Sequence, residues 1–231
     1  MIDWHTHILP GIDDGSRDTE ESIKMLSELK AQGIEYVVAT PHFIANAESV
    51  DEFLERRDKA YANLTAAADE GLPKILCGAE VKYYPGIARM DGLEKLTVGD
   101  TKILLLEMPM AKWTKYTLKE LFELASTKGL IIVLAHVERY LAMQEGDTPE
   151  KLCKNGILMQ VNASFINGIW TKRRALKYMA QGYFHFLGSD CHNMTTRAPK
   201  IGEAYEFIKK KCGDEYFSQM NKYGYRTLNL T

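Results

Sequence analysis

Short apolar segments alternate with segments of helical periodicity along the whole chain. Residues 103–106 and 130–134 are almost continuously apolar, which is typical of strands buried on both faces of a parallel sheet. Between such segments the apolar residues recur three or four positions apart, as Ile23, Leu26 and Leu29 do, which indicates amphipathic helices. Strands that alternate with helices predict an α/β fold with a mainly parallel sheet.

Start signals mark the helices between the strands. Ser49 with Glu52, and Thr117 with Glu120, match the capping pattern at a helix N-terminus. Seven strands are expected, at residues 2–8, 34–40, 74–81, 101–108, 130–136, 157–162 and 185–189. Two helices are expected after them, at residues 199–211 and 214–222, and residues 83–99 are expected to form a loop with a short helix. Both a seven-stranded, TIM-barrel-like α/β barrel and an open doubly wound sheet fit this order.

Length and composition narrow the class of protein. A chain of 231 residues suits one domain, residues 1–231, because α/β barrels run to about 200–250 residues. Its 29 basic and 31 acidic residues give a formal net charge of −2, which excludes a broadly basic nucleic-acid binder. No apolar run approaches the ~20 residues of a membrane span, and Asp3 and His5 stand where a signal peptide needs apolar residues. The absence of a long apolar run predicts no membrane insertion. The four cysteines form no CxxC pair, so we expect reduced thiols and a cytoplasmic location.

Residue types that bind metal ions gather at the ends of the predicted strands. In a barrel the C-terminal ends of all strands meet at one face, where active sites form. This placement favours the barrel over the open sheet. The residues so placed are five of the six histidines and three acids: His5, His7, His42, Glu80, Glu107, His136, Asp190 and His192. His185, which begins its strand at the opposite face, is predicted to be structural.

The spacing of these residues points to metal binding. Side chains two positions apart in a strand lie on one side, so His5 and His7 can hold one ion together. A single such pair also occurs in loops, and the prediction therefore rests on the whole set. Glu80 and Glu107 follow apolar strands, where a carboxylate is costly to bury unless it is paired or bound to metal.

The donor set also predicts a chemistry. Imidazoles and carboxylates without thiolates suit manganese, iron or zinc. These donors are too many for one ion, and at three or four ligands each they imply roughly two or three ions. Clustered divalent ions generate hydroxide from water at neutral pH and stabilise anions, typically in phosphoester hydrolysis.

Charged residues near this set are candidates for substrate binding and proton transfer. Arg139 follows His136 by three positions and can bind a phosphate with two hydrogen bonds, although a surface ion pair is the alternative. Arg197 is a second candidate for anion binding. Asp13 and Asp14 follow the first strand, and either is a candidate ligand or proton donor unless both only shape a turn.

Six motifs, spread in order over essentially the whole chain, resemble those of one protein family. They are His-Thr-His-Ile-Leu-Pro-Gly-Ile-Asp-Asp-Gly at 5–15, Ala-Thr-Pro-His at 39–42, Gly-Ala-Glu at 78–80, His-Val-Glu-Arg-Tyr at 136–140, Gln-Val-Asn-Ala at 160–163 and Gly-Ser-Asp-Cys-His-Asn at 188–193. The chain resembles the metal-dependent tyrosine phosphatases of bacterial capsular polysaccharide systems, within the polymerase-and-histidinol-phosphatase (PHP) superfamily. Phe43 and Val137 depart from the residues frequent there, but neither departure removes a ligand.

The resemblance implies a distorted seven-stranded α/β barrel and a site of two or three ions, commonly manganese, with iron, zinc or magnesium as alternatives. It implies hydrolysis of phosphotyrosine on the membrane-associated autokinase that controls polysaccharide export, and it leaves a homo-oligomer open. It also assigns roles by motif. His5, His7, Glu80 and Asp190 would hold one ion; Glu80, Glu107 and His136 a second; Asp14, His42 and His192 a third; and Arg139 would bind the phosphate.

Other functions remain open at this stage. Cys191 and Arg197 have the C-x5-R spacing of phosphatases with a cysteine nucleophile, but the residues between them include no glycine and Asp190 would raise the pKa of the thiol. The same metal site also suits a small phosphomonoester such as histidinol phosphate, or a non-catalytic metal-binding partner of a kinase. Six aromatic residues near the strand ends are candidates for a phenol-binding rim, or for core packing: Phe43, Tyr83, Tyr84, Trp113, Phe165 and Trp170.

Overall fold

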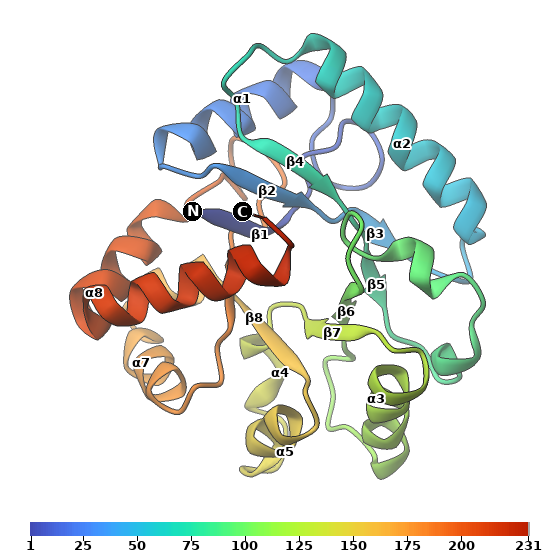
Figure 1. Ribbon diagram of the computed structural model, residues 1–231, viewed down its shortest axis with the longest axis vertical. Coiled ribbons are helices and arrows are strands. Elements are labelled where there is room, and N and C mark those ends of the chain that lie inside the picture. Colours follow the sequence, from blue (N-terminus) through green and yellow to red (C-terminus); the bar gives the residue numbers. More distant parts are fainter. Residues whose placement is uncertain (231) are drawn as a thin grey trace.

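The computed structural model describes residues 1–230 and shows helices arranged around a central set of parallel strands (Figure 1). The strands are β1 (Ile2–Thr6), β2 (Tyr36–Ala39), β3 (His42–Phe43), β4 (Lys74–Cys77), β5 (Glu80–Lys82), β6 (Ile103–Glu107), β7 (Ile131–Leu134), β8 (Leu158–Asn162) and β9 (Phe186–Gly188). The α-helices are α1 (Thr19–Ala31), α2 (Val50–Ala67), α3 (Lys115–Thr127), α4 (Glu138–Leu141), α5 (Thr148–Lys154), α6 (Ala163–Asn167), α7 (Lys172–Ala180) and α8 (Gly202–Thr227). Two 3-10 helices, η1 (Ile87–Arg89) and η2 (Leu93–Leu96), occupy the predicted irregular segment.

Side-chain caps explain where the longer helices begin. Ser49 and Glu52 form the predicted capping box at the start of α2, which satisfies backbone N–H groups that have no partner inside the helix. The predicted cap of α3 was wrong, because Thr114, and not Thr117, accepts a hydrogen bond there. The two expected C-terminal helices form one long element, α8, with a break at Gly213, where φ is 89°.

The strands form a curled parallel sheet in two ladders. One ladder has the order β1-β2-β4, and the other has the order β3-β5-β6-β7-β8-β9. The ends of the curl meet where Thr6 of β1 bridges Cys191, just past β9, and where the Asp190 N–H donates to the His5 carbonyl at 2.8 Å. This close approach requires glycine at position 188, because a Cβ there would lie 2.7 Å from the Cβ of His5.

One of the seven expected strands is divided in the structure, and another is followed by a short strand that was not expected. The segment predicted as residues 34–40 ends with β2, and β3 then begins the second ladder after Pro41, which has no N–H to donate to a ladder. The segment predicted as 74–81 divides at Gly78 into β4 and β5. A Cβ at Gly78 would lie 2.9 Å from the Val98 side chain, so a larger residue would require Val98 to shift. This division and the additional strand β3 account for the nine strands of residues 1–230.

Apolar side chains cover both faces of the sheet, as the apolar strands predict. In β6, Leu104 and Leu106 join the large core beneath the helices, whereas Ile103 and Leu105 join a smaller cluster on the other face. Leu228, near the C-terminus, packs into this smaller cluster. Among the residues described, no helix is both long enough and apolar enough to cross a membrane.

Candidate metal centre

The first strand delivers two fully buried histidines to the carboxyl edge of the sheet. His5 lies in β1 and His7 directly follows it, and their Nε2 atoms are 3.1 Å apart. The other ring nitrogen of each histidine is held by a neighbour: Nδ1 of His5 lies 3.2 Å from Gln160 Oε1, and Nδ1 of His7 lies 2.7 Å from Asp13 Oδ2. Partners on Nδ1 orient an imidazole so that Nε2 faces a metal ion.

Glu80, the first residue of β5, stands at the centre of the site. Its side chain is 1% exposed, and Oε2 lies 3.2 Å from His5 Nε2, 3.4 Å from His7 Nε2 and 2.9 Å from His42 Nδ1. Its Oε1 lies 2.7 Å from His136 Nε2. Burial raises the pKa of this carboxyl, but the surrounding imidazoles outweigh that effect and hold the pKa well below its usual range. Glu80 is therefore an anion in a buried ring of imidazoles.

Asp190 brings a second buried carboxylate to the same centre. Its Oδ1 lies 3.8 Å from His5 Nε2 and 3.6 Å from His7 Nε2. Two arginines donate to it: Arg197 to Oδ1 at 2.7 Å, and Arg139 to Oδ2. Burial raises its pKa, but the histidines and arginines together lower the pKa below its usual value. Asp190 adopts a φ of 55°, and such rare backbone conformations of non-glycine residues concentrate at functional sites.

The two aspartates after β1 differ in burial and in the residues that they contact. Asp13 is a supporting residue: besides His7, it accepts hydrogen bonds from the backbone N–H groups of Gly15 and His42, both at 2.9 Å. The Asp14 side chain is 65% exposed, and its Oδ1 lies 3.3 Å from His42 Nε2 and 3.4 Å from His192 Nε2. Asp14 therefore stands at the open side of the site, next to His42 and His192.

The donor atoms form three groups that fit metal ions. Within each group the atoms lie within 4.8 Å of one another. His192 Nε2 is buried without a hydrogen-bond partner, as expected of a nitrogen that faces an ion. Burial, His7 and Arg197 lower the pKa of His192 to about 4, which keeps this imidazole neutral. The groups are His7, Asp14, His42 and His192; His5, His7 and Asp190; and His5, Glu80 and His136.

Glu107 lies slightly apart from these groups. It ends β6, its side chain is 22% exposed, and its Oε1 lies 3.7 Å from His136 Nε2. The eight residues predicted from strand ends thus lie at one place, with Glu107 at its border. His185 lies elsewhere, with its Nδ1 3.1 Å from the backbone nitrogen of Met159.

Two amide side chains of β8 were missed as site residues, although the sequence motif contained them. Gln160 Oε1 accepts a hydrogen bond from the His136 N–H at 2.7 Å, and its Nε2 donates to Asn162 Oδ1 at 2.9 Å. Asn162 in turn donates to Asp190 Oδ2 at 2.9 Å. Two polar residues spaced by two in an otherwise apolar strand were the available signal.

Most of the predicted aromatic rim belongs to the core. Phe43, Tyr83, Trp113 and Phe165 are all at most 9% exposed. Tyr84 is half-buried and Trp170 is 94% exposed, so only these two present substantial surface to solvent.

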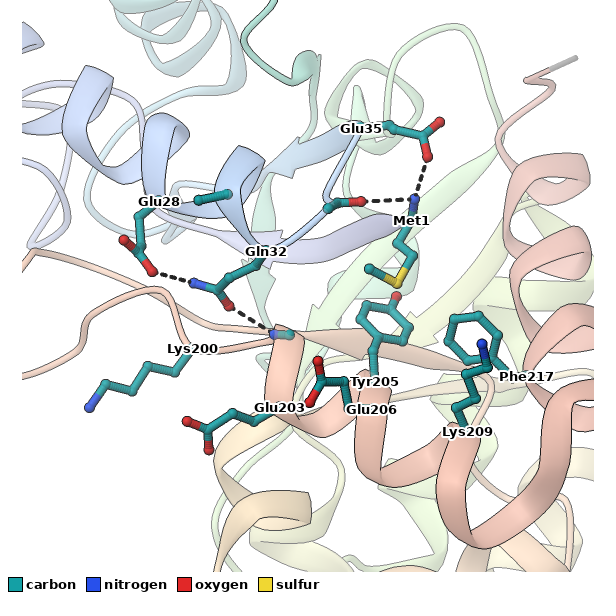
Figure 2. Close-up of a pocket in the computed structure, with 13 residues that line it drawn as sticks. Met1, Glu28, Gln32, Glu35, Lys200, Glu203, Tyr205, Glu206, Lys209 and Phe217 are labelled. Atoms are coloured by element: carbon teal, nitrogen blue, oxygen red, sulfur yellow. Dashed lines mark hydrogen bonds and ion pairs between the residues drawn. The ribbon is translucent and has the colours of Figure 1, made fainter.

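A cavity of about 780 Å³ lies away from this centre, at the amino ends of β1 and β2 (Figure 2). The amino group of Met1 lies 2.9 Å from Glu35 Oε1 there, and Gln32 accepts the backbone N–H of Gly202 at the start of α8. None of the predicted site residues lines this cavity.

The curled parallel sheet and the buried donors define an α/β protein with groups able to hold several metal ions at the carboxyl ends of its strands. The chain belongs to the CpsB/CapC family of capsular polysaccharide synthesis, whose model matches residues 1–224. The resemblance seen in the motifs is thereby confirmed.

Relatives of known name support this assignment. The chain is 32% identical to tyrosine-protein phosphatase YwqE of Bacillus subtilis over 221 residues, which cover 93% of this chain and 86% of that protein. It is 30% identical to tyrosine-protein phosphatase CpsB of Streptococcus agalactiae over an alignment of 235 positions, which covers 95% of this chain and 94% of that protein. It also matches a crystal structure with a TM-score of 0.83 and 29% identity, over 100% of this chain and 96% of that one. That structure is from work on YwqE of Bacillus subtilis and CpsB of Streptococcus pneumoniae, described as unique metal-dependent tyrosine phosphatases.

Proposed function

We propose that this chain is a metal-dependent phosphatase that hydrolyses phosphotyrosine in proteins, with residues 1–231 acting as one domain. The observation that carries the proposal is that three metal-type donor groups adjoin one another through His5 and His7, while Arg139 and Arg197 both pair with Asp190 of one group. The names of the relatives support the same activity. As its substrate we propose a membrane-associated tyrosine autokinase of polysaccharide export, which the phosphatase would contact from the cytoplasm.

The finer features follow the same reasoning. We propose manganese as the native metal, with roughly two or three ions, because nitrogen and oxygen donors suit it; iron, zinc and magnesium are alternatives. We also propose that the curled sheet is a distorted seven-stranded barrel of the PHP type. If β2 with β3 and β4 with β5 each count as one position, seven strand positions lie around the curl.

Different residues of the site would have different roles in hydrolysis. Bound divalent ions would supply activation of water and neutralise phosphoryl charge. Arg139 would bind phosphoryl oxygens with its planar fork, and Arg197 would contact them from beside it. Water adds to phosphorus while the bond to the phenolate oxygen breaks, which yields phosphate and tyrosine. Because phenol has a pKa of about 10, phenolate leaves with less help than an alkoxide, and Asp14 at the mouth would protonate it or hold an ion.

A substrate comparison tests this proposal against the small-molecule alternative. We expect the manganese-loaded protein to hydrolyse a phosphotyrosine peptide with a kcat/KM at least about tenfold above that for histidinol phosphate. Steady-state assays with metal analysis of the same sample provide the measurement. A preference for histidinol phosphate would favour the alternative, and no turnover of either substrate would favour a non-catalytic metal-binding protein.

A second prediction concerns Cys191. The thiol is 1% exposed, and burial, followed by the charges of Asp3 and Asp190, raises its pKa well above the usual value. A nucleophilic cysteine needs the opposite environment. We therefore expect Cys191→Ser to retain activity within about threefold, while a chelator abolishes activity in the wild type. An inactive Cys191→Ser variant that keeps its metal, beside a wild type insensitive to chelation, would reverse the assignment.

A further inference from the structure

A second cavity, of about 590 Å³, opens beside the metal centre. It is lined by Ile44, Ala45, Asn46, Lys82, Tyr83 and Tyr84. Strands β3 and β5 pair in parallel, with His42 opposite Glu80. Ile44 and Lys82 follow these two residues by two positions each, which is about 6–7 Å along an extended chain. The cavity therefore continues the wall of the metal centre toward solvent.

Four of the six residues that line this cavity are apolar or aromatic, and Asn46 and Lys82 are polar. The Ile44 side chain is 38% exposed and Tyr84 is half-buried, so both offer apolar surface to a molecule that enters. Lys82 adds an exposed cation, which attracts an anionic polypeptide.

One wall is held in place by a buried carboxylate of α3. Glu120 is 3% exposed; its Oε2 accepts the Tyr83 hydroxyl at 2.7 Å, and its Oε1 accepts the Gly86 N–H at 2.6 Å. These two bonds fix the segment that follows β5. A wall fixed before the substrate arrives loses little conformational entropy on binding.

We propose that this cavity is a peptide subsite, which binds an apolar or aromatic side chain next to the phosphotyrosine. The inference rests on the proposed function and names the kind of protein segment that the site selects. A small phosphomonoester has no neighbouring residue to place in this cavity, whereas a polypeptide substrate has one on each side of its phosphotyrosine. The volume lies in the range of about 300–1,000 Å³ that is common for ligand pockets.

Two phosphotyrosine peptides test the subsite, one with leucine and one with serine on both sides of the phosphotyrosine. We expect the metal-loaded wild type to prefer the leucine peptide about tenfold in kcat/KM, mainly through KM, because burial of a leucine side chain is favourable. In Ile44→Ser and in Tyr84→Ser the preference should fall to about twofold or less. Ile131→Ser is the matched control, since Ile131 is 39% exposed but does not line the cavity, and its preference should stay at the wild-type value.

The outcomes separate the subsite from the activity itself. Equal rates for the two peptides in the wild type, or an unchanged preference in both variants, overturn the subsite while leaving the phosphatase intact. A wild type that hydrolyses neither peptide overturns the proposed function, and the subsite with it.

Discussion

Replacement of Glu80 by glutamine should lower phosphatase turnover by at least about 10³-fold and remove roughly one or more metal ions per chain. The substitution keeps the shape of the side chain but removes its charge. Glu80 Oε1 and Oε2 lie within 3.4 Å of ring nitrogens of four histidines, so loss of its charge affects several candidate ligands at once. Metal analysis of the purified variant and its rate on a phosphotyrosine peptide provide the measurement.

A second buried glutamate provides the matched control for this experiment. Glu120 is 3% exposed and also accepts hydrogen bonds, but it binds Tyr83 and Gly86 and lies outside the metal groups. We expect Glu120→Gln to keep the metal content of the wild type. A Glu80→Gln variant with full metal content and wild-type turnover would contradict the proposed site.

Replacement of Arg139 by alanine should lower kcat/KM for a phosphotyrosine peptide by about 10²–10³-fold while the metal content stays unchanged. The guanidinium is 37% exposed and is held at the rim by Asp190, so an entering phosphate can reach it. Arg139→Lys should recover only a small part of the loss, because an ammonium cannot form the paired hydrogen bonds of a guanidinium.

The control for Arg139 is an arginine on the surface of the same protein. Arg173 is exposed on α7 and does not line the metal centre, so Arg173→Ala should leave both kcat/KM and metal content at wild-type values. If Arg139→Ala instead loses metal in proportion to activity, Arg139 acts by holding Asp190 in place. That result would contradict its proposed contact with the phosphate.

Local signals in the sequence predicted much of the fold. The order of strands and helices followed from apolar periodicity, and the capping box at Ser49 set the start of α2, because both depend on residues close together in the chain. The start of α3 was misplaced for a tertiary reason. Glu120 accepts hydrogen bonds from Tyr83 and Gly86, which lie more than 30 positions earlier, and so it does not cap the helix.

For the site, the sequence by itself determined which residue types stand at the strand ends, since strand position and side-chain chemistry are both local properties. Only the tertiary structure decided which residues lie at the centre of the site, which lie at its border and which support another side chain. It made Asp13 a support for His7 and placed Asp14 at the open side, set Glu107 at the border, and added Gln160 as a link between His5 and His136. These differences depend on segments far apart in the sequence that the curled sheet brings together, such as β1 and β9. Whether two side chains touch depends on such long-range packing, which no local pattern encodes.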